Sequence, residues 1–299
     1  MAINKIFLTG GTGTIGTEVA RDLVAHGYAV RGLARSDASA AKLQALGVTP
    51  VRGDLTTLDV ARAEAAAADA VVHLAIDFAR VIDSGSEEQA FVEAVGDVLK
   101  GTGKTFIGTS GTYIGVGTGK TPFTEADDGR PGAFRYKFES TFRSLGDDGG
   151  VRAIVIRPSL THSDKIDGFP RTVIAKPREL GFAPVLDGGE EKWTYNDLHD
   201  VAVLFRLALE KAPAGFSRYH GTDESTSNRQ IAEIVAAHWG VPVREATREE
   251  LTEAYGFFAT FFGKDNTVSS VATREQLGWE PKGARFIDLL KDGTYFKQL

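Results

Sequence analysis

Continuously apolar runs alternate with amphipathic stretches along the first half of the chain. The apolar, β-branched runs predict strands at residues 6–8, 29–33, 49–52, 70–74, 105–109 and 151–156. Helical spacing of apolar positions between them predicts helices at residues 15–25, 38–46, 60–67, 87–100 and 135–145. Strands without a polar face are typical of a parallel sheet covered by helices on both sides. The pattern therefore predicts an α/β fold with a doubly wound parallel sheet.

The pattern changes near Pro158. Longer irregular stretches rich in Gly and Pro follow, and they surround helices expected at residues 197–210, 228–239, 248–255 and 273–277. We therefore expect a core at residues 1–160 and a smaller C-terminal α/β lobe at residues 161–299. Residues from about 190 to 220 are expected to return to the core, because a helix resumes there.

Composition narrows the possible partners. The chain has 299 residues, 42% of them hydrophobic, with a formal net charge of −6 and no cysteine. Net acidity argues against a nucleic-acid partner, because phosphate binding needs a basic surface. Without cysteine, and without His, Asp and Glu at metal-ligand spacing, we expect no metal. No signal-peptide or membrane-span pattern occurs, so we expect a cytoplasmic protein without membrane contact.

The strongest motif is the glycine-rich stretch Thr9-Gly-Gly-Thr-Gly-Thr-Ile-Gly16, placed between the first strand and the first helix. In a dinucleotide-binding turn, one glycine makes the tight turn, one lets the backbone approach a pyrophosphate, and one lets helix and strand pack closely. The pyrophosphate then lies on the helix N-terminus, where free N–H groups favour an anion. The residues expected to bind it are Thr9, Gly10, Gly13, Thr14, Ile15 and Gly16. The alternative is a purely structural glycine turn.

The end of the second strand bears on which nicotinamide cofactor binds. A carboxylate there would accept hydrogen bonds from a free ribose 2′-hydroxyl, but the chain has Ala34 and Arg35. An arginine can pair with a 2′-phosphate, so we expect NADP(H) to be preferred over NAD(H). The alternative is that Arg35 is a solvated loop charge.

Two further strand ends are expected to line the same crevice, because the carboxyl ends of parallel strands bound it. Asp54, followed by Leu55, is placed to accept a hydrogen bond from the adenine amino group. Leu74 and Ala75 are expected under the ribose. His73, just before them, is equally well explained as a structural histidine.

In these motifs the chain resembles the extended short-chain dehydrogenase/reductase superfamily, also called the NAD-dependent epimerase/dehydratase family. The motifs occur in the family's order: Thr9-Gly-Gly-Thr-Gly-Thr-Ile-Gly16, Gly53-Asp-Leu55, His73-Leu-Ala75, Thr109-Ser-Gly-Thr-Tyr-Ile-Gly115, Arg157-Pro158 and Asp200-Val-Ala202. The rest resembles an atypical branch that lacks the usual Tyr-x-x-x-Lys pair. The resemblance implies a Rossmann core that binds NADP(H) and a lobe that binds the substrate.

The resemblance also implies where catalysis takes place. Family members use a Ser or Thr after the fifth strand, which Ser110 matches, and a Tyr-x-x-x-Lys on the next helix. There the tyrosine exchanges a proton with the substrate, and the lysine holds the ribose and lowers the tyrosine pKa. Tyr113, close behind Ser110, either points into the crevice or packs under the following loop.

Two registers fit the helix that should carry this pair. If Glu139 is the glutamate that follows the family's lysine, Arg135 takes the lysine position and Pro131 the tyrosine position, so the general acid is missing. Arg135 would still hold the ribose or an anionic substrate group. If Tyr136 is the family's tyrosine, Ser140 replaces the lysine. We favour the first register, and the proton donor is then displaced to Tyr136 or lost.

The same segment also has a purely structural interpretation. Arg135 and Glu139 form an i, i+4 pair of the kind that supports exposed helices. Phe134, Phe138 and Phe142 recur every four residues and look like a buried stripe.

The substrate side is expected in the C-terminal half. Thr161 and His162 follow the sixth strand and are candidate lining residues, and His162 or Tyr113 could replace a missing acid. Trp193 and Tyr195 either face a pocket or belong to a core. The aromatic stretch at residues 255–262 could form a lid or wall for an apolar substrate, or a subunit interface.

We therefore expect an NADPH-dependent oxidoreductase that reduces a carbonyl or a related group on a small organic molecule. One alternative is a sensor protein that holds NADP(H) without turnover. Another is an epimerase or dehydratase that uses the cofactor transiently, although no sugar-nucleotide signal is evident in the lobe. A homodimer is expected by analogy with the superfamily only.

Overall fold

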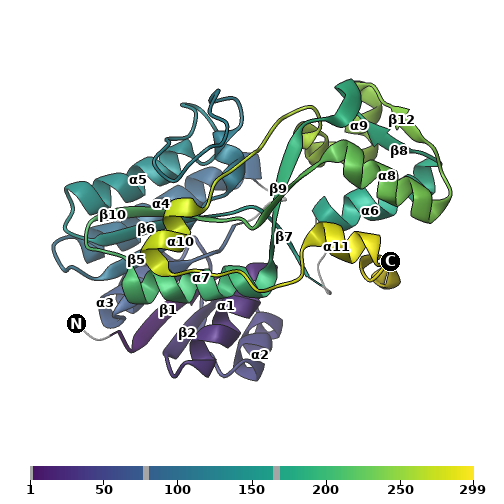
Figure 1. The fold of residues 1–299 in the computed structure, drawn as a ribbon. Coiled ribbons are helices and arrows are strands. Elements are labelled where there is room, and N and C mark those ends of the chain that lie inside the picture. Colours follow the sequence, from purple (N-terminus) through teal and green to yellow (C-terminus); the bar gives the residue numbers. More distant parts are fainter. Residues whose placement is uncertain (1–2, 77–80, 164–168) are drawn as a thin grey trace.

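The computed structural model describes residues 3–76, 81–163 and 169–299. Its centre is a parallel sheet with the strand order β10-β6-β5-β4-β1-β2-β3 (Figure 1). The strands are β1 (Lys5–Thr9), β2 (Ala29–Ala34), β3 (Thr49–Arg52), β4 (Ala70–His73), β5 (Thr105–Thr109), β6 (Arg152–Pro158) and β10 (Phe216–Gly221). The predicted α/β fold with a doubly wound parallel sheet is confirmed.

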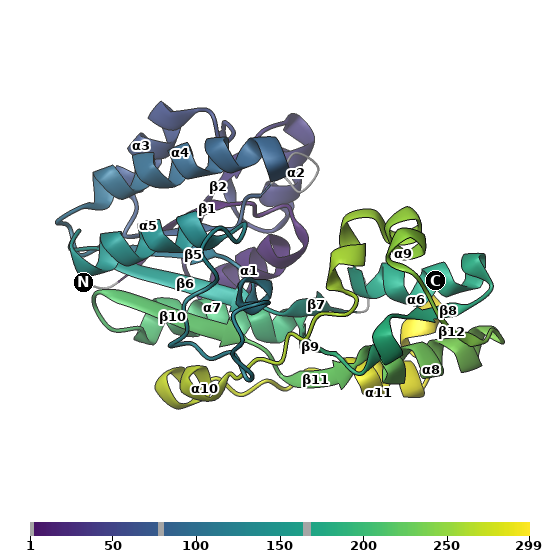
Figure 2. The same ribbon diagram turned by 90° about the horizontal axis from the view of Figure 1, so that it is seen from above.

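Each central strand buries both faces, which explains its unbroken apolar sequence. On β1, Ile6 and Leu8 face one core cluster and Phe7 faces another. The first cluster lies under α1 (Thr14–Ala25), α2 (Asp37–Ala45) and α7 (Leu198–Lys211). The second lies under α3 (Leu58–Ala67), α4 (Val81–Leu99) and α5 (Tyr136–Asp147), which run along one side of the sheet in Figure 2.

The strand order reverses direction at β1, which lies between β4 and β2. In an open parallel sheet, ligands bind outside the carboxyl ends of the strands at such a switch point. The register places Thr9, the last residue of β1, beside His73, the last residue of β4. His73 in turn lies beside Gly108 of β5.

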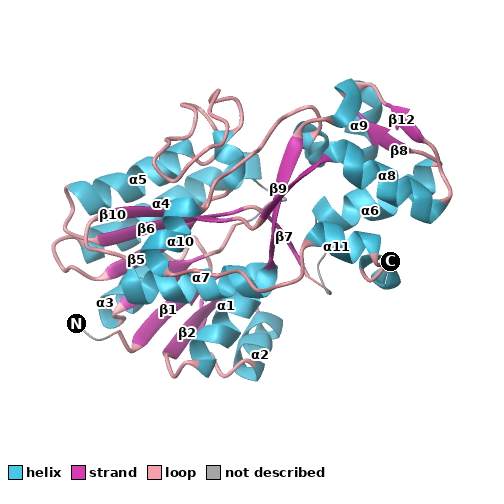
Figure 3. Ribbon diagram, in the orientation of Figure 1, coloured by secondary structure: helices cyan, strands magenta, loops and turns pink. Residues whose placement is uncertain are grey.

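A second, smaller lobe lies beside the part of the chain that contains the main sheet (Figure 3). It contains the helices α6 (Phe169–Leu180), α8 (Asn228–Trp239), α9 (Arg248–Tyr255) and α11 (Phe286–Lys291), with the short strands β8 (Ala183–Val185) and β12 (Val243–Glu245). The small sheet β11-β9-β7 connects it to the core, through β7 (Leu160–His162), β9 (Lys192–Asp197) and β11 (Glu224–Ser227). Trp193 and Tyr195 of β9 are both 1% exposed and belong to the core of this lobe.

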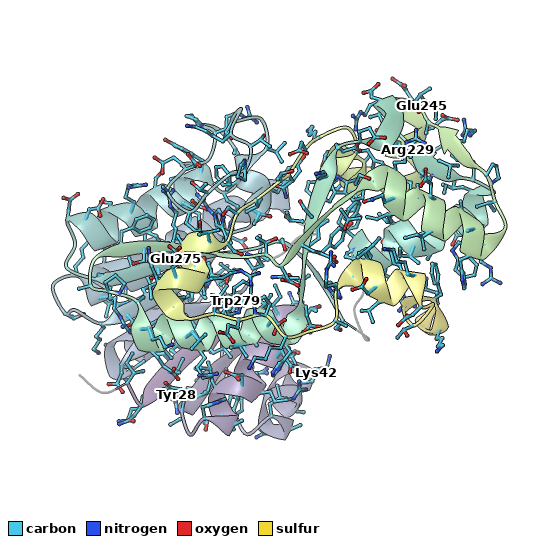
Figure 4. All side chains as sticks on the ribbon, in the orientation of Figure 1. Tyr28, Lys42, Arg229, Glu245, Glu275 and Trp279 are labelled. Carbon is cyan, nitrogen blue, oxygen red and sulfur yellow. The ribbon has the colours of Figure 1, made fainter. Side chains whose placement is uncertain are left out.

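The C-terminal segment returns to the core at α10 (Val271–Leu277), which packs against α7 and β10. Trp279 lies beside α7 (Figure 4), and its Nε1 donates to the carbonyl oxygen of Asp200 at 2.9 Å. The Asp200 carboxylate accepts hydrogen bonds from the backbone N–H groups of Lys282 and Gly283. The Asp200-Val-Ala202 motif therefore fastens this returning segment to α7. Among the described residues, no helix is long and apolar enough to cross a membrane.

Several elements differ from the sequence-based expectation. The segment Phe169–Leu180 is a helix, α6, although the Gly- and Pro-rich surroundings suggested an irregular stretch. The main sheet has a further strand, β10. The helix α5 begins at Tyr136, so Phe134 precedes it and is 51% exposed, while Phe138 and Phe142 are buried as expected. The interpretation of Phe134 as part of the buried stripe was therefore wrong.

Candidate functional site

The glycines of the glycine-rich turn differ in how closely other atoms pack around them. Gly10 has φ +73°, and a Cβ there would lie 2.6 Å from the Ala75 nitrogen. A Cβ on Gly16 would overlap the carbonyl oxygen of Gly10. A Cβ on Gly13 would meet less resistance, since it would lie 3.3 Å from the Gly10 carbonyl oxygen, a close contact that a shift of a few tenths of an ångström relieves. Gly10 and Gly16 therefore serve the packing of β1, α1 and β4, while Gly13 is exposed.

Gly13 is also the N-cap of α1, and no side chain caps this helix end. The first N–H groups of a helix that lacks a side-chain cap are available to a ligand, and the helix dipole favours an anion there. An exposed glycine allows a phosphate to approach these N–H groups closely. The turn therefore fits the pyrophosphate of a dinucleotide.

The carboxyl ends of β2 and β3 bring Arg35 and Asp54 close together. Both side chains are exposed, and the positive charge of Arg35 contributes to lowering the Asp54 pKa. The larger cause of that lowered pKa is the hydrogen bond from the Thr56 hydroxyl to Asp54 Oδ1, at 2.7 Å. Ala34, where a carboxylate would select a free 2′-hydroxyl, is fully buried. Two exposed cations lie at this corner, Arg35 and Arg52, which is beside Ala34 in the sheet and 3.3 Å from Asp37.

A buried line of polar groups runs beneath the crevice from β1 to β5. The hydroxyl of Thr9 lies 2.7 Å from His73 Nδ1, and His73 Nε2 lies 3.3 Å from Glu88 Oε1. The other oxygen of Glu88 accepts a hydrogen bond from Arg135 at 2.6 Å. Arg135 also donates to the carbonyl oxygen of Thr109, the last residue of β5. The line joins three neighbouring strands to α4 and to the start of α5.

The hydrogen bonds hold these side chains in fixed positions. The backbone N–H of Ala75 donates to Thr9 Oγ1 at 3.3 Å, and the same oxygen lies 2.7 Å from His73 Nδ1. The other ring nitrogen of His73 faces Glu88 Oε1. Burial acts to raise the Glu88 pKa, but hydrogen bonds and charge from His73 and Arg135 outweigh it, so the net pKa is lowered. Glu88 is therefore an anion paired with the Arg135 cation.

Ser110 is the residue after Thr109, at the end of this line of polar groups. Its backbone N–H donates a hydrogen bond to the carbonyl oxygen of Ile156 in β6, at 2.8 Å, which fixes its position at the end of the sheet. Within the described part of the chain, Ser110 Oγ and Arg135 Nε are buried atoms with no hydrogen-bond partner. Unpartnered buried polar atoms cost free energy, and these two belong to residues that the sequence assigns to the site. Arg135 lies next to Ser110 along the backbone, because it donates to the carbonyl oxygen of the preceding residue, Thr109.

A second buried ion pair fixes the orientation of α5. Glu139 accepts two hydrogen bonds from Arg157, at 2.8 and 2.5 Å, and Arg157 is fully buried. The family's glutamate and Arg-Pro motif are thus the two halves of one contact between α5 and β6. Because Glu139 faces inward, Arg135, one turn earlier, faces inward as well. The expectation that Arg135 and Glu139 form an exposed pair with each other was wrong, since each pairs with a different strand or helix.

The other candidate residues lie in different surroundings. Pro131 precedes α5 rather than lying on it, and Tyr136 is the first residue of that helix and half-buried. Tyr113 reaches the C-terminal lobe, where its hydroxyl donates to the carbonyl oxygen of Thr260 at 2.9 Å. Its ring packs on Phe261 with centroids 4.5 Å apart. Tyr113 therefore links the loop after β5 to the aromatic stretch.

That aromatic stretch is only partly exposed. Tyr255 and Phe262 are buried in the lobe, whereas Phe257 is 60% exposed. His162 is 1% exposed and its ring lies tilted against that of Phe286 of α11, with centroids 5.3 Å apart, and burial lowers its pKa to about 4. It is therefore neutral near pH 7 and packs inside the lobe. Among the residues that the model describes, no group of three or more His, Asp or Glu side chains could hold a metal ion.

Glu88 is a site residue that the sequence reasoning missed. It is 5% exposed and falls on the apolar stripe of α4 with Phe91, Val92 and Val95. An acidic residue at an apolar-stripe position was the available signal, because a carboxylate there must find a buried partner. The identity of the partner, nearly fifty residues further along the chain, depends on the tertiary fold.

Comparison with known proteins agrees with this geometry. Residues 6–219 match the model of the NAD dependent epimerase/dehydratase family. An uncharacterized protein of Schizosaccharomyces pombe, C2A9.02, is 34% identical over 98% of this chain and 100% of its own length. A farnesyl-dihydroquinoline-oxide ketoreductase of Stigmatella aurantiaca is 38% identical, but over only 27% of this chain and 24% of its own length.

Solved structures show the same fold. A UDP-glucose 4-epimerase from Thermotoga maritima superimposes with a TM-score of 0.74 over 98% of this chain and 99% of that one, at 18% identity. The fold and the glycine turn define a nicotinamide-dependent enzyme of the short-chain dehydrogenase/reductase type. The chain belongs to the NAD dependent epimerase/dehydratase family.

Proposed function

We propose that this protein is an NADPH-dependent oxidoreductase that reduces a carbonyl, or a related group, on a small organic molecule. The observation that carries the proposal is that Arg135 donates to the carbonyl oxygen of Thr109, the residue before Ser110, at the carboxyl end of β5, while Ser110 Oγ and Arg135 Nε are buried without a partner. When bound, the nicotinamide supplies hydride. Residues 1–160 hold the cofactor in this proposal, and residues 161–299 provide the substrate side.

Ser110 would act on the substrate oxygen, and Arg135 on the cofactor beside it. The Ser110 hydroxyl donates a hydrogen bond to that oxygen and polarises the carbonyl. Arg135 carries a fixed positive charge, with which it would hold the ribose of the nicotinamide half. The arginine cannot serve as the acid, because it stays protonated at any relevant pH. The proton that neutralises the oxygen comes from Tyr136 or from water.

Cofactor preference follows from the corner formed by β2 and β3. Arg35 can form charge-assisted hydrogen bonds with a 2′-phosphate, and no carboxylate replaces it at Ala34. Asp54 keeps one carboxylate oxygen engaged by Thr56, and we propose that the other accepts from the adenine amino group. Leu55, Leu74 and Ala75 would complete the walls beside adenine and ribose. The ketoreductase relationship supports a carbonyl substrate.

A second function, an NADP(H) sensor without turnover, is favoured by Pro131. Proline has no titratable group, so the family's proton relay is missing at this position. An epimerase or dehydratase that uses the cofactor transiently remains a further alternative within the family.

Two measurements test the proposal. Quenching of tryptophan fluorescence with NADPH and with NADH gives cofactor affinity and preference. Steady loss of nicotinamide absorbance with a panel of ketones, aldehydes and enones gives turnover. We expect NADPH to bind more tightly, and we expect Ser110→Ala to lower kcat while the matched variant Ser217→Ala, in β10, does not. Tight NADPH binding with no turnover across the panel would instead establish the sensor.

A further inference from the structure

Arg135 is held in one orientation by contacts on several sides. One terminal nitrogen donates to Glu88 and the other to the carbonyl oxygen of Thr109. The guanidinium carbon lies 3.8 Å from the ring centre of Phe138, so a cation–π contact supports the flat face. With both terminal nitrogens engaged, Nε is the nitrogen left without a partner.

Glu88 is itself held from the other side. Its Oε1 faces His73 Nε2, and His73 is anchored at Nδ1 by Thr9. His73 also stacks on Phe91 with ring centroids 5.0 Å apart. The carboxylate can therefore rotate little, and its second oxygen has a defined position for Arg135.

Stability alone gives a weak reason to keep such a pair. Replacing a buried ion pair by well-packed apolar residues is often neutral or stabilising, because the charges lose their hydration on burial. An arginine with a long flexible stem, however, needs a second contact if its guanidinium is to stay beside a reacting group. The Glu88 carboxylate supplies that contact directly.

We propose that Glu88 is a positioning residue that holds the Arg135 guanidinium beside Ser110, against the nicotinamide half of the cofactor. This proposal rests on the proposed function for where the nicotinamide lies. Glu88 acts through Arg135 and does not touch the cofactor. The adenine half, near Arg35, is independent of it.

The test compares Glu88→Gln, Arg135→Gln and the double variant with the wild type. Asp22→Asn is the matched control, since Asp22 is paired with Arg206 at 2.9 Å between α1 and α7 and is 8% exposed. Calorimetric titration gives the affinity for NADPH and for adenosine 2′,5′-bisphosphate, which lacks the nicotinamide half. Thermal unfolding gives stability, and kcat is measured where turnover occurs.

We expect Glu88→Gln to weaken NADPH binding by about 10-fold or more, as for the loss of a charge-assisted hydrogen bond. Binding of adenosine 2′,5′-bisphosphate should stay within about 2-fold of the wild type, because its contacts are with the adenine half. Arg135→Gln should give the same NADPH loss, with no further loss in the double variant. The double variant should regain thermal stability, since no buried charge is left unpaired, yet keep weak NADPH binding.

Two results would overturn the proposal. One is a double variant that regains wild-type NADPH affinity together with its stability, which would make the pair purely structural. The other is a Glu88→Gln variant that weakens both ligands equally. Neither result depends on turnover. A wild-type protein that binds NADPH but reduces no substrate would refute the proposed function, and the role of Glu88 would still be tested by the binding measurements.

Discussion

Replacing Gly13 by alanine adds a methyl group at the N-terminus of α1, where we place the pyrophosphate. The backbone of Gly13 has φ −78° and ψ 175°, which alanine adopts without strain. The change gains about 0.4–1 kcal/mol by restricting the unfolded chain. It loses about 0.5–1 kcal/mol because alanine is a poorer N-cap than glycine. The two effects offset, so we expect Tm to move by no more than about 2 °C.

Cofactor binding should respond very differently from stability. The methyl group keeps the pyrophosphate from the first N–H groups of α1, and the loss of one charge-assisted hydrogen bond weakens binding by about 10-fold or more. Calorimetric titration with NADPH and thermal unfolding of the same samples measure the two effects. Gly16→Ala is the contrasting variant, because its Cβ overlaps the Gly10 carbonyl oxygen and the fold itself should be lost. A Gly13→Ala protein that binds NADPH as tightly as the wild type would refute the placement of the pyrophosphate.

Three further predictions concern charge. Arg35→Ala should weaken NADPH about 10-fold or more and leave NADH unchanged in titrations at low salt; equal losses for both would exclude a 2′-phosphate contact. Glu139→Gln leaves the buried cation of Arg157 unpaired and should cost about 3–5 kcal/mol in urea unfolding, a value that an unchanged midpoint would contradict. Burial lowers the pKa of His162 from 6.5 to about 4, so its contribution is present above pH 6.5 and lost as pH falls toward 4. His162 should therefore account for about 2 kcal/mol of the stability lost between pH 7 and pH 5, beside a similar share from His220, whose pKa is lowered to about 3. His162→Leu should make the loss smaller by about 2 kcal/mol; an equal loss in the variant and the wild type would refute this share.

The sequence was sufficient to predict much of the core because its central strands are buried on both faces. Thr105–Thr109 forms such a strand with the expected bounds, and Asn228–Trp239 forms the expected helix. Their apolar periodicity is local, so it can be recognised without knowledge of the partners.

Elements that depend on tertiary partners were missed. The strand β10 is interrupted by Ser217, Arg218 and His220, and it pairs with one neighbour, β6. Its polar residues are buried because Arg218 pairs with Asp128 and His220 accepts from Arg157. These partners lie far apart in the chain, so no local pattern reveals them. The helix α6 was obscured by Pro177 within it.

The residues of the candidate site also fall into two groups, those that local sequence predicts and those that depend on tertiary partners. The glycine turn and Ser110 follow from local motifs placed at strand ends. The orientation of Arg135 does not, because it depends on Glu88 from another helix and on Thr109 from a strand. The segment where the family's Tyr-x-x-x-Lys pair is expected can be located from the sequence, but what holds Arg135 in place there is a property of the packed structure.

Transfer of deuterium to a reduced ketone, from NADPH that carries deuterium at both C4 positions, is the decisive measurement for hydride transfer to an oxygen held by Ser110. Mass spectrometry of the product reads the label, with Ser110→Ala run beside the wild type. We expect one deuterium on the former carbonyl carbon and a product yield that falls sharply in the Ser110→Ala reaction. Reduced product without label, or equal yields from the two proteins, would contradict hydride transfer to an oxygen held by Ser110.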